Sequence, residues 1–249
     1  MEAFQITVSF DRVADIYDRT RSLPDEAMTR LVKALASELD GCKGILDVGV
    51  GTGRFALPLQ KAGLDVVGID ISRKMISKAQ DKRVRNLMFA DARLLPFKQK
   101  AFDVAISVHL LHLVSNWQLT LVEICRVTRS FLVSLSYANK EPVGEAYDQL
   151  LRRYGYERHR LGKSERELKD IVAPAKCVPV TAYETLSDVS LANFAQRTSS
   201  SQWEIPVEVN QKVVDELRGR FAGKTFTQEL GILIWRIDDL RTRFEKPDA

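Results

Sequence analysis

A glycine-rich bend between two apolar segments most constrains how this chain can fold. Residues 45–48 (I-L-D-V) are typical of a short buried strand, and the sequence G-V-G-T-G follows at once. Gly49, Gly51 and Gly53 permit a sharp turn and the close approach of a ligand, because none carries a Cβ atom. Residues 54–62 then read as a helix, whose first N–H groups can hold a carboxylate or a phosphate. A plain glycine loop in an α/β core remains the alternative, since such a pattern alone is a weak signal.

Three aspartates recur at nearly equal intervals beside predicted strands. Asp47 closes the first strand, Asp70 follows a second strand at residues 64–69, and Asp91 follows a third at residues 86–90. Each interval fits one strand, one helix and a turn, which together make a βαβ repeat. We therefore predict an α/β fold in which the three carboxylates share one edge of a parallel sheet, where such sheets bind ligands. Asp70 lies at the distance along the chain at which an acid holds ribose hydroxyls.

The spacing of the glycines separates two classes of nucleotide ligand. Dinucleotide-binding loops carry G-x-G-x-x-G, whereas this loop reads G-x-G-x-G. Asp47, just before the loop, would repel a pyrophosphate and attract an ammonium or sulfonium group. The pattern therefore favours a cationic nucleoside over NAD, and a nicotinamide dehydrogenase is the less favoured enzyme class.

Four segments, in order, resemble the motifs of class I S-adenosylmethionine (SAM) methyltransferases. Residues 47–53 (D-V-G-V-G-T-G) resemble the first motif, and residues 70–75, from Asp-Ile-Ser to Met, resemble the second. Residues 91–104 are similar to the third block and the fourth strand, and residues 123–127 (E-I-C-R-V) to the helix before the fifth. The match points to the small-molecule branch, the UbiE/BioC-like or type 11 methyltransferases, over roughly residues 10–136.

This resemblance implies a fold, a cofactor and a set of site residues. The fold would be a doubly wound, seven-stranded, mostly parallel Rossmann-like sheet with a helical cap. SAM would be the cofactor, and the activity would be methyl transfer to a small-molecule acceptor. The residues expected to bind the cofactor are Asp47, Gly49, Gly51, Gly53, Asp70, Ile71, Met75, Asp91, Ala92 and Ser107.

Two segments are predicted to cover the site. Residues 1–40 would form an N-terminal helical lid, whose F-D-R-V-A-D-I-Y-D stretch resembles the family's F-D-x-x-A-x-x-Y-D segment and would turn Tyr17 toward the site. Residues 41–249 would form the methyltransferase domain, with a helical cap inserted at about residues 137–172. The cap is rich in basic residues: Arg152, Arg153, Arg158, His159, Arg160, Lys163 and Arg166. They indicate either a patch for an anionic substrate or RNA, or a solvated helical face, since acidic residues interleave with them.

The chemistry of methyl transfer limits what the catalytic residues must do. SAM carries an activated methyl group, so the protein needs to align the acceptor and exclude water, and neither a metal nor a covalent nucleophile is required. A general base is needed only for a protonated acceptor. His112, after the fourth strand, is the candidate base, and Tyr17 is a candidate for orienting the acceptor; either could instead be a plain wall residue. His109 and His112 would bind a metal only with further ligands, so we predict no metal site.

Composition narrows the partners and the compartment. A net charge of +4 neither demands nor excludes nucleic acid. Without an appended RNA-binding module or an N-P-P-Y motif, RNA methylation is a weaker alternative, as is a SAM-binding protein without turnover. No apolar run reaches about 18 residues, so no membrane span is expected. The three cysteines lack C-x-x-C spacing and suit a reduced cytoplasm. We therefore expect a cytoplasmic enzyme, whose acceptor and oligomeric state the sequence leaves open.

Overall fold

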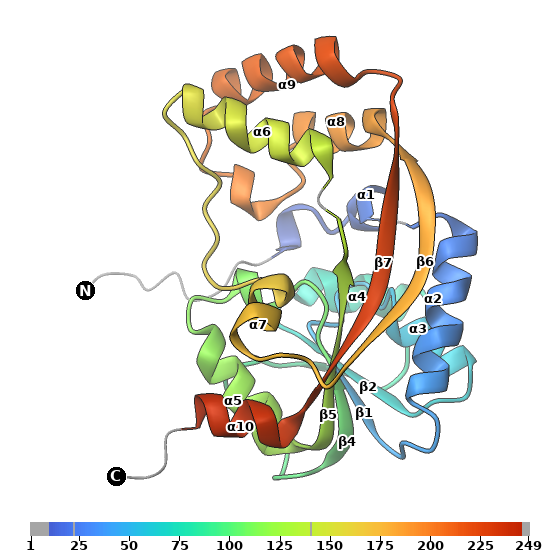
Figure 1. Ribbon diagram of the computed structural model, residues 1–249. Helices are drawn as coiled ribbons and strands as arrows, with labels where there is room; N and C mark the ends of the chain where they lie inside the picture. Colours follow the sequence, from blue (N-terminus) through green and yellow to red (C-terminus); the bar gives the residue numbers. More distant parts are fainter. Residues whose placement is uncertain (1–9, 22, 140, 246–249) are drawn as a thin grey trace.

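The computed structural model describes residues 10–21, 23–139 and 141–245, which fold as strands flanked by helices (Figure 1). The strands are β1 (Ile45–Val48), β2 (Val66–Asp70), β3 (Leu87–Phe89), β4 (Phe102–Ile106), β5 (Thr128–Tyr137), β6 (Lys176–Leu186) and β7 (Thr225–Arg236). The α-helices are α1 (Tyr17–Arg21), α2 (Asp25–Glu38), α3 (Ala56–Lys61), α4 (Arg73–Asp81), α5 (Trp117–Val127), α6 (Pro142–Arg153), α7 (Glu165–Ile171), α8 (Ser187–Ala195), α9 (Val207–Phe221) and α10 (Ile237–Phe244). Short 3-10 helices are η1 (Phe10–Arg12), η2 (Leu111–Leu113) and η3 (Ser200–Gln202). Positions 1–9, 22, 140 and 246–249, including the start of the predicted lid, lie outside this description.

A mixed sheet organises the described residues in the strand order β3-β2-β1-β4-β5-β7-β6. The pairs from β3 to β5 are parallel, whereas β7 is antiparallel to both β5 and β6. This arrangement confirms the predicted doubly wound, mostly parallel sheet with an antiparallel hairpin at one edge. No helix among the described residues is long and apolar enough to cross a membrane.

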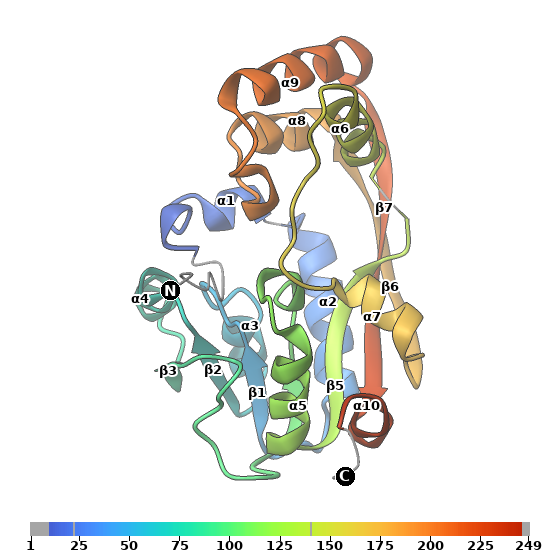
Figure 2. The same cartoon turned by 90° about the vertical axis from the view of Figure 1, so that its left-hand side faces the viewer.

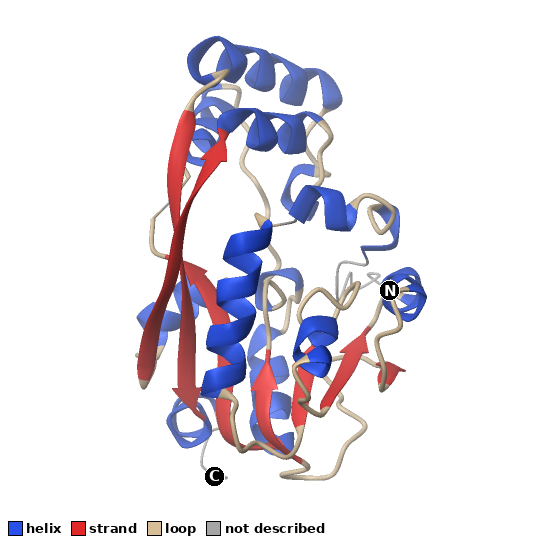
Figure 3. Cartoon of the chain, turned by 90° about the vertical axis from the view of Figure 1, so that its right-hand side faces the viewer, coloured by secondary structure: helices blue, strands red, loops and turns tan. Residues whose placement is uncertain are grey.

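Two apolar cores, one on each face, hold the sheet between layers of helices (Figures 2 and 3). Every residue of β1 is buried, so this strand needs apolar side chains on both faces. Ile45 packs with Leu31 and Leu35 of α2 in one core, and Leu46 packs with Leu121 of α5 in the other. The central strands are thereby fixed, and their carboxyl ends present the loops that follow them.

The β6–β7 hairpin is longer than the sequence indicated and extends beyond the sheet. In the sequence only residues 230–237 form a long apolar run, whereas β7 begins at Thr225. Its first residues, T-F-T-Q-E, pair with β6 alone, because β5 pairs with β7 only from Leu230 onward. They lack the continuous apolar pattern of a strand buried on both faces, which is why the sequence did not mark them.

A separate layer of helices lies above the sheet at the far end of this hairpin (Figure 1). Helices α6, α8 and α9 share a third apolar core, which includes Tyr147, Phe194 and Leu217. These helices come from residues 142–153 and 187–221, a wider part of the chain than the predicted cap at about 137–172. Helix α7, within that predicted cap, instead packs Leu168 against the core of the sheet. The division into lid, main domain and cap stays a prediction.

Candidate active site

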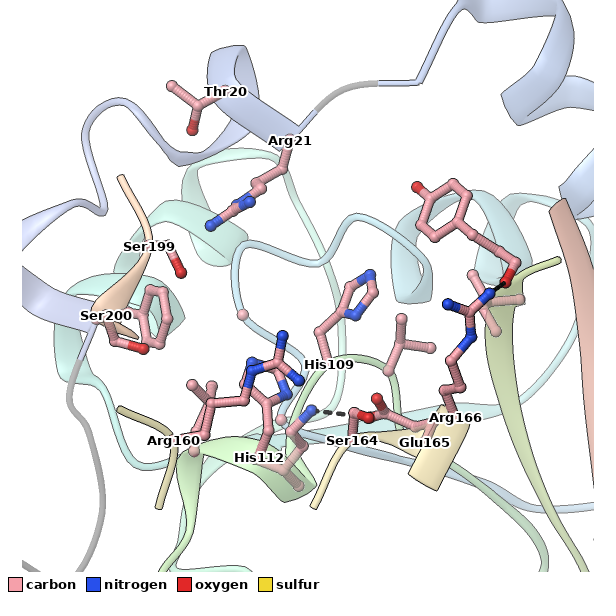
Figure 4. A pocket seen from close by; sticks show the side chains of 18 of the residues that line it. Thr20, Arg21, His109, His112, Arg160, Ser164, Glu165, Arg166, Ser199 and Ser200 are labelled. Carbon is pink, nitrogen blue, oxygen red and sulfur yellow. Dashed lines mark hydrogen bonds between the residues drawn. The ribbon is translucent and has the colours of Figure 1, made fainter. Parts of the chain in front are cut away.

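A cavity of about 990 Å³ lies at the carboxyl ends of the parallel strands, beneath the helical layer. Its wall combines the loop after β1, the ends of β2 and β5, the segment after β4, helix α1 and parts of α6 and α8. Figure 4 shows side chains from segments far apart in the sequence around one space, among them Arg21 of α1, His109 and His112 after β4, and Glu165 of α7. The structure therefore brings together most of the residues that the sequence assigned to a site.

Asp70 links the glycine loop to the start of α4. One carboxylate oxygen, Oδ2, accepts the N–H of Gly51 at 2.8 Å, and Oδ1 accepts the N–H of Ser72 at 2.8 Å. Burial raises the pKa of Asp70, and these N–H groups oppose the rise. The side chain also lines the cavity, so it is held in one orientation with lone pairs left for a ligand's donors.

The N–H groups of the glycine loop are occupied within the protein. Gly49 donates to the carbonyl of Ile69 at 2.9 Å, Gly53 donates to Val50 at 2.9 Å, and Gly51 donates to Asp70. The carboxylate that the loop holds is the side chain of Asp70. The sequence suggested that the first N–H groups of the following helix could hold a carboxylate or a phosphate of a ligand, and this stays a prediction.

The three glycines differ in what they face, although each has a positive φ. A Cβ atom on Gly51 would meet only Tyr17, at 4.0 Å, and one on Gly49 would lie 3.1 Å from Leu110. Both glycines line the cavity. A Cβ atom on Gly53 would lie 2.4 Å from Val84, and Gly53 is not part of the cavity wall. Gly53 therefore permits close packing beside α4 rather than contact with a ligand.

Asp47 and Ser107 lie beneath the cavity wall rather than on it. Asp47 is 3% exposed, and its Oδ2 atom has no hydrogen-bond partner among the described residues. Burial, with a smaller contribution from the charge of Asp70, raises the pKa of Asp47 to about 7. The Ser107 hydroxyl is likewise buried without a described partner. Their predicted roles in binding a cofactor stay predictions.

The remaining predicted cofactor residues line one end of the cavity. Ile71 and Met75 contribute apolar wall, and Ala92 lies beside Asp91. Arg93 pairs with Asp91 at 2.6 Å and holds the pKa of that carboxyl below its usual value. An apolar wall next to two oriented carboxylates suits a flat base joined to a hydroxylated sugar.

Two histidines from the segment after β4 face the cavity (Figure 4). Their ring centroids are 6.4 Å apart, and His109 has a φ of 58°, a region that non-glycine residues seldom adopt. Burial lowers the pKa of His112 to about 4 and that of His109 to about 3, so both imidazoles are neutral at pH 7. Among the described residues, no cluster of three or more His, Cys, Asp or Glu side chains is arranged for a metal ion.

The N-terminal segment is fastened over the glycine loop and α4. Asp18 accepts a hydrogen bond from Thr52 at 2.6 Å, and Asp11 accepts one from Ser72 at 2.5 Å. Asp15 forms an ion pair with Lys78 at 2.7 Å. These contacts place Tyr17 on the cavity wall, as the resemblance to the family implied. The catalytic roles of Tyr17 and His112 stay predictions.

The basic residues of the predicted cap divide between the cavity and solvent. Arg158 pairs with Asp148 at 2.5 Å, and Arg166 donates to the backbone carbonyl of Tyr137 at 2.8 Å. Arg153, by contrast, is exposed. Arg158 and Arg166 therefore satisfy groups within the protein, whereas the other five members of the cluster are exposed.

Sequence reasoning missed three charged residues of the cavity wall. Glu165, at the start of α7, is 4% exposed, and its Oε1 accepts the N–H of Leu110 at 3.2 Å. Burial raises the pKa of Glu165 to about 7. Arg21 and Arg54 also line the cavity. Two positions in the sequence could have indicated them: Arg21 lies one helical turn after Tyr17, and Arg54 adjoins the glycine loop.

Comparisons with known sequences agree with this site. Residues 46–131 match a family model described as a methyltransferase domain. The chain is 36% identical over 134 residues to the demethylmenaquinone methyltransferase of Tropheryma whipplei (strain Twist). That match covers 50% of this chain and 55% of the relative, so the chain spans about half the length of the relative that it matches.

Solved structures share the fold. Magnesium protoporphyrin IX methyltransferase from Synechocystis PCC 6803, a structure with bound SAH, aligns with a TM-score of 0.52 and 15% identity over 90% of this chain and 95% of that one. The [4+2]-cyclase SpnF aligns with a TM-score of 0.56 and 20% identity over 93% and 97%. At such identities the likeness shows the fold alone. Taken with the sequence matches, it confirms the predicted methyltransferase resemblance and SAM as the cofactor that this resemblance implies.

Proposed function

We propose that this chain, whose residues 46–131 match the methyltransferase domain family, is a SAM-dependent methyltransferase acting on a small-molecule acceptor. The observation that carries the proposal is the position of Asp70, which is fixed by two backbone N–H groups while it faces the cavity. A relative named for demethylmenaquinone methylation supports a small-molecule acceptor. The acceptor itself and a cytoplasmic location remain predictions.

The residues around the cavity fit the cofactor. The space beside Gly51 is open, because a Cβ atom there would meet nothing closer than Tyr17 at 4.0 Å. Asp70 would hold the ribose hydroxyls, and Ile71, Met75 and Ala92 would line the adenine. When bound, SAM supplies a methyl group activated on a sulfonium. Asp47 lies below the loop with an unpartnered carboxylate oxygen, which is available to an ordered water or a protonated amine.

The protein's own groups would then position the acceptor and remove its proton. His112 is neutral at pH 7, so an imidazole nitrogen can accept a proton from a hydroxyl or ammonium acceptor. Tyr17, held on the wall by its segment's contacts with α4, would orient the acceptor. Helices α6 and α8 cover the cavity and would limit the access of water.

The alternatives find less support in the cavity. An RNA acceptor would require an open basic surface, whereas Arg158 and Arg166 are bonded within the protein under a helical layer. A SAM-binding protein without turnover would need no space for an acceptor beside the cofactor. The wall beyond the two histidines, toward Asn139, Ser190 and Asn193, offers space and polar groups for an acceptor.

Transfer of label from methyl-tritiated SAM tests the proposal. The protein is incubated with a small-metabolite fraction and, separately, with an RNA fraction. We expect labelled product in the small-metabolite fraction, and we expect the Asp70→Asn variant to yield less because it binds SAM more weakly. Label transferred only to RNA would contradict the small-molecule assignment. Binding of SAM without labelled product in either fraction would favour the protein without turnover.

A further inference from the structure

Two arginines on the cavity wall face it without an acidic partner among the described residues. The Nη2 atom of Arg21 makes one long hydrogen bond, 3.4 Å, to the carbonyl of Thr198. The Nε atom of Arg54 is buried with no hydrogen-bond partner in the part of the chain that the structure describes, and the guanidinium carbon of Arg54 lies 4.8 Å from the ring centroid of Phe55. Among the other arginines of the wall, Arg158 pairs with Asp148, and Arg166 donates hydrogen bonds to the backbone carbonyls of Tyr137 and Ala138.

The uncompensated charges act on each other and on their neighbours. Burial lowers the pKa of Arg21, and the charge of Arg54 lowers it further. The same two cations help to lower the pKa of His109, after the larger effect of burial. Partly buried cations without a counter-ion are costly, so the arrangement favours the entry of an anion.

We infer that Arg21 and Arg54 bind an oxyanion, a carboxylate or a phosphate, carried by the methyl acceptor. This inference rests on the proposed function and specifies its substrate class. The planar guanidinium presents donors in a fork that matches both carboxylate and phosphate. Tyr17, Tyr137 and Tyr183 line the same cavity and can add hydroxyl donors.

The order of the strands places this site on the acceptor side. Asp70 ends β2 and adjoins β3, on one side of the glycine loop. Tyr137 ends β5, and Tyr183 lies on β6, on the opposite side of β1 and β4. Arg21 donates a hydrogen bond to the carbonyl of Thr198, in the segment that follows α8. Because Asp70 is proposed to hold the ribose, this contact places the oxyanion site toward the helical layer and away from the adenosine end.

Three acidic residues of the cavity wall are engaged by other groups of the protein. Asp148 pairs with Arg158, and Glu167 accepts hydrogen bonds from Ser164 and Lys163. Glu165 accepts the backbone N–H of Leu110. Burial also raises the pKa of Glu141 and Glu165. Both side chains therefore carry less negative charge and repel an incoming anion less.

Calorimetric titration of small anions into the protein saturated with S-adenosylhomocysteine (SAH) tests the inference. The probes are malonate and inorganic phosphate, and the tighter of the two identifies the oxyanion. In Arg21→Gln and Arg54→Gln we expect that probe to bind about tenfold more weakly or worse, because each loses charge-assisted hydrogen bonds. Arg19→Gln, on the same helix but exposed, is the matched control and should bind the probe as the wild type does.

The cofactor also carries a carboxylate, so the titrations must separate the two sources. We expect the dissociation constant of SAH to change by less than about threefold in Arg21→Gln and Arg54→Gln. The inference is overturned if both variants lose SAH affinity while 5′-methylthioadenosine, which lacks the carboxylate, binds as before. It is also overturned if neither probe binds the wild type, or if the probes bind both variants unchanged.

The proposed function can fail independently of this inference. If SAH does not bind the wild type, the proposed function is contradicted, and the anion titrations are then made on the free protein. Circular dichroism and thermal unfolding verify that each variant is folded. Arg54→Lys provides a second variant that keeps the charge but lacks the planar fork, and it should bind the probe with intermediate affinity.

Discussion

At the scale of single residues, Asp70 serves two purposes, since it fastens the glycine loop to α4 and faces the cavity. In Asp70→Asn the amide offers a single acceptor oxygen, so one of the two N–H groups loses its partner. We expect SAH to bind about tenfold more weakly or worse, and the free energy of unfolding to fall by about 1–3 kcal/mol. Calorimetry and chemical denaturation measure the two effects.

Ser72→Ala is the control for the Asp70 prediction. It removes the side chain that caps α4 by accepting the N–H of Met75, which costs about 1 kcal/mol, but it leaves Asp70 in place. It also removes the hydrogen bond from Ser72 to Asp11, which still accepts the N–H of Lys74 at the start of α4. Stability should fall while the affinity for SAH is retained. Unchanged SAH affinity in Asp70→Asn would mean that Asp70 has only a structural role.

Two buried carboxyls, Asp47 and Glu165, make stability depend on pH. Burial raises the pKa of each to about 7, against about 4 in the unfolded chain. Between these values the folded state binds more protons, so each group makes stability fall as pH rises, by at most about 1.4 kcal/mol per pH unit. His109 and His112, whose pKa values are lowered, act in the opposite sense below about pH 6.5.

The difference in the free energy of unfolding between the wild type and Asp47→Asn, or Glu165→Gln, therefore measures the contribution of each carboxyl. Urea unfolding at about pH 5 and about pH 8 should show that each variant gains stability relative to the wild type at the higher pH. A relative stability that is independent of pH would contradict the raised pKa values.

Glu165 also illustrates why part of the site escaped prediction. In the sequence it is an acidic residue in the first turn of a short helix, which is ordinarily exposed. Its burial depends on the segment after β4, including Leu110, which lies far away along the chain. By contrast, Asp70 was predicted, because an acidic residue directly after an apolar strand can be recognised from its neighbours in the sequence.

At the scale of secondary-structure elements, the glycines of the loop have different roles: Gly53 allows close packing, and Gly51 leaves space for a ligand. Gly53→Ala would place a Cβ atom 2.4 Å from Val84 at a φ of 76°, so we expect a loss of about 2 kcal/mol or more in the free energy of unfolding. Gly51→Ala has open space and should lose only about 1–2 kcal/mol for its positive φ, but its methyl group would enter the cavity. Gly51→Ala should therefore weaken SAH binding more than Gly53→Ala does, once both are folded. The reverse order of SAH affinities would contradict these assignments.

The elements differ in how far the sequence revealed them. Strands β1, β2 and β4 are apolar runs between turn signals, and the βαβ repeats that join β1, β2 and β3 followed from the regular recurrence of acids. The polar first part of β7 gave no such signal, because its pairing with β6 is made by backbone groups. A helical cap was predicted only at about residues 137–172, because the common core of the layer depends on contacts between residues 142–153 and 187–221 that periodicity does not encode.

At the scale of the whole molecule, the helical layer has a polar network within its own core. The hydroxyl of Tyr147 donates to Asn210 at 2.5 Å and accepts a hydrogen bond from Gln202 at 3.2 Å. Tyr147→Phe removes both bonds and should destabilise the layer by about 1–3 kcal/mol. Hydrogen exchange should accelerate in α6, α8 and α9 and remain unchanged in β1 and β2.

Tyr154→Phe is the matched control for this network, because Tyr154 is exposed at the end of α6. It should leave the exchange pattern as it is. Equal acceleration in the layer and in the central strands of Tyr147→Phe would show that the molecule opens only as one unit.

The central claim is that the cavity beside Asp70 is a site for SAM. Calorimetric titration of the wild type with SAM, SAH and NAD tests it most directly. The glycine spacing, the position of Asp70 and the open space beside Gly51 predict binding of SAM and SAH and no binding of NAD. Binding of NAD, with no response to either SAM or SAH, would contradict the claim.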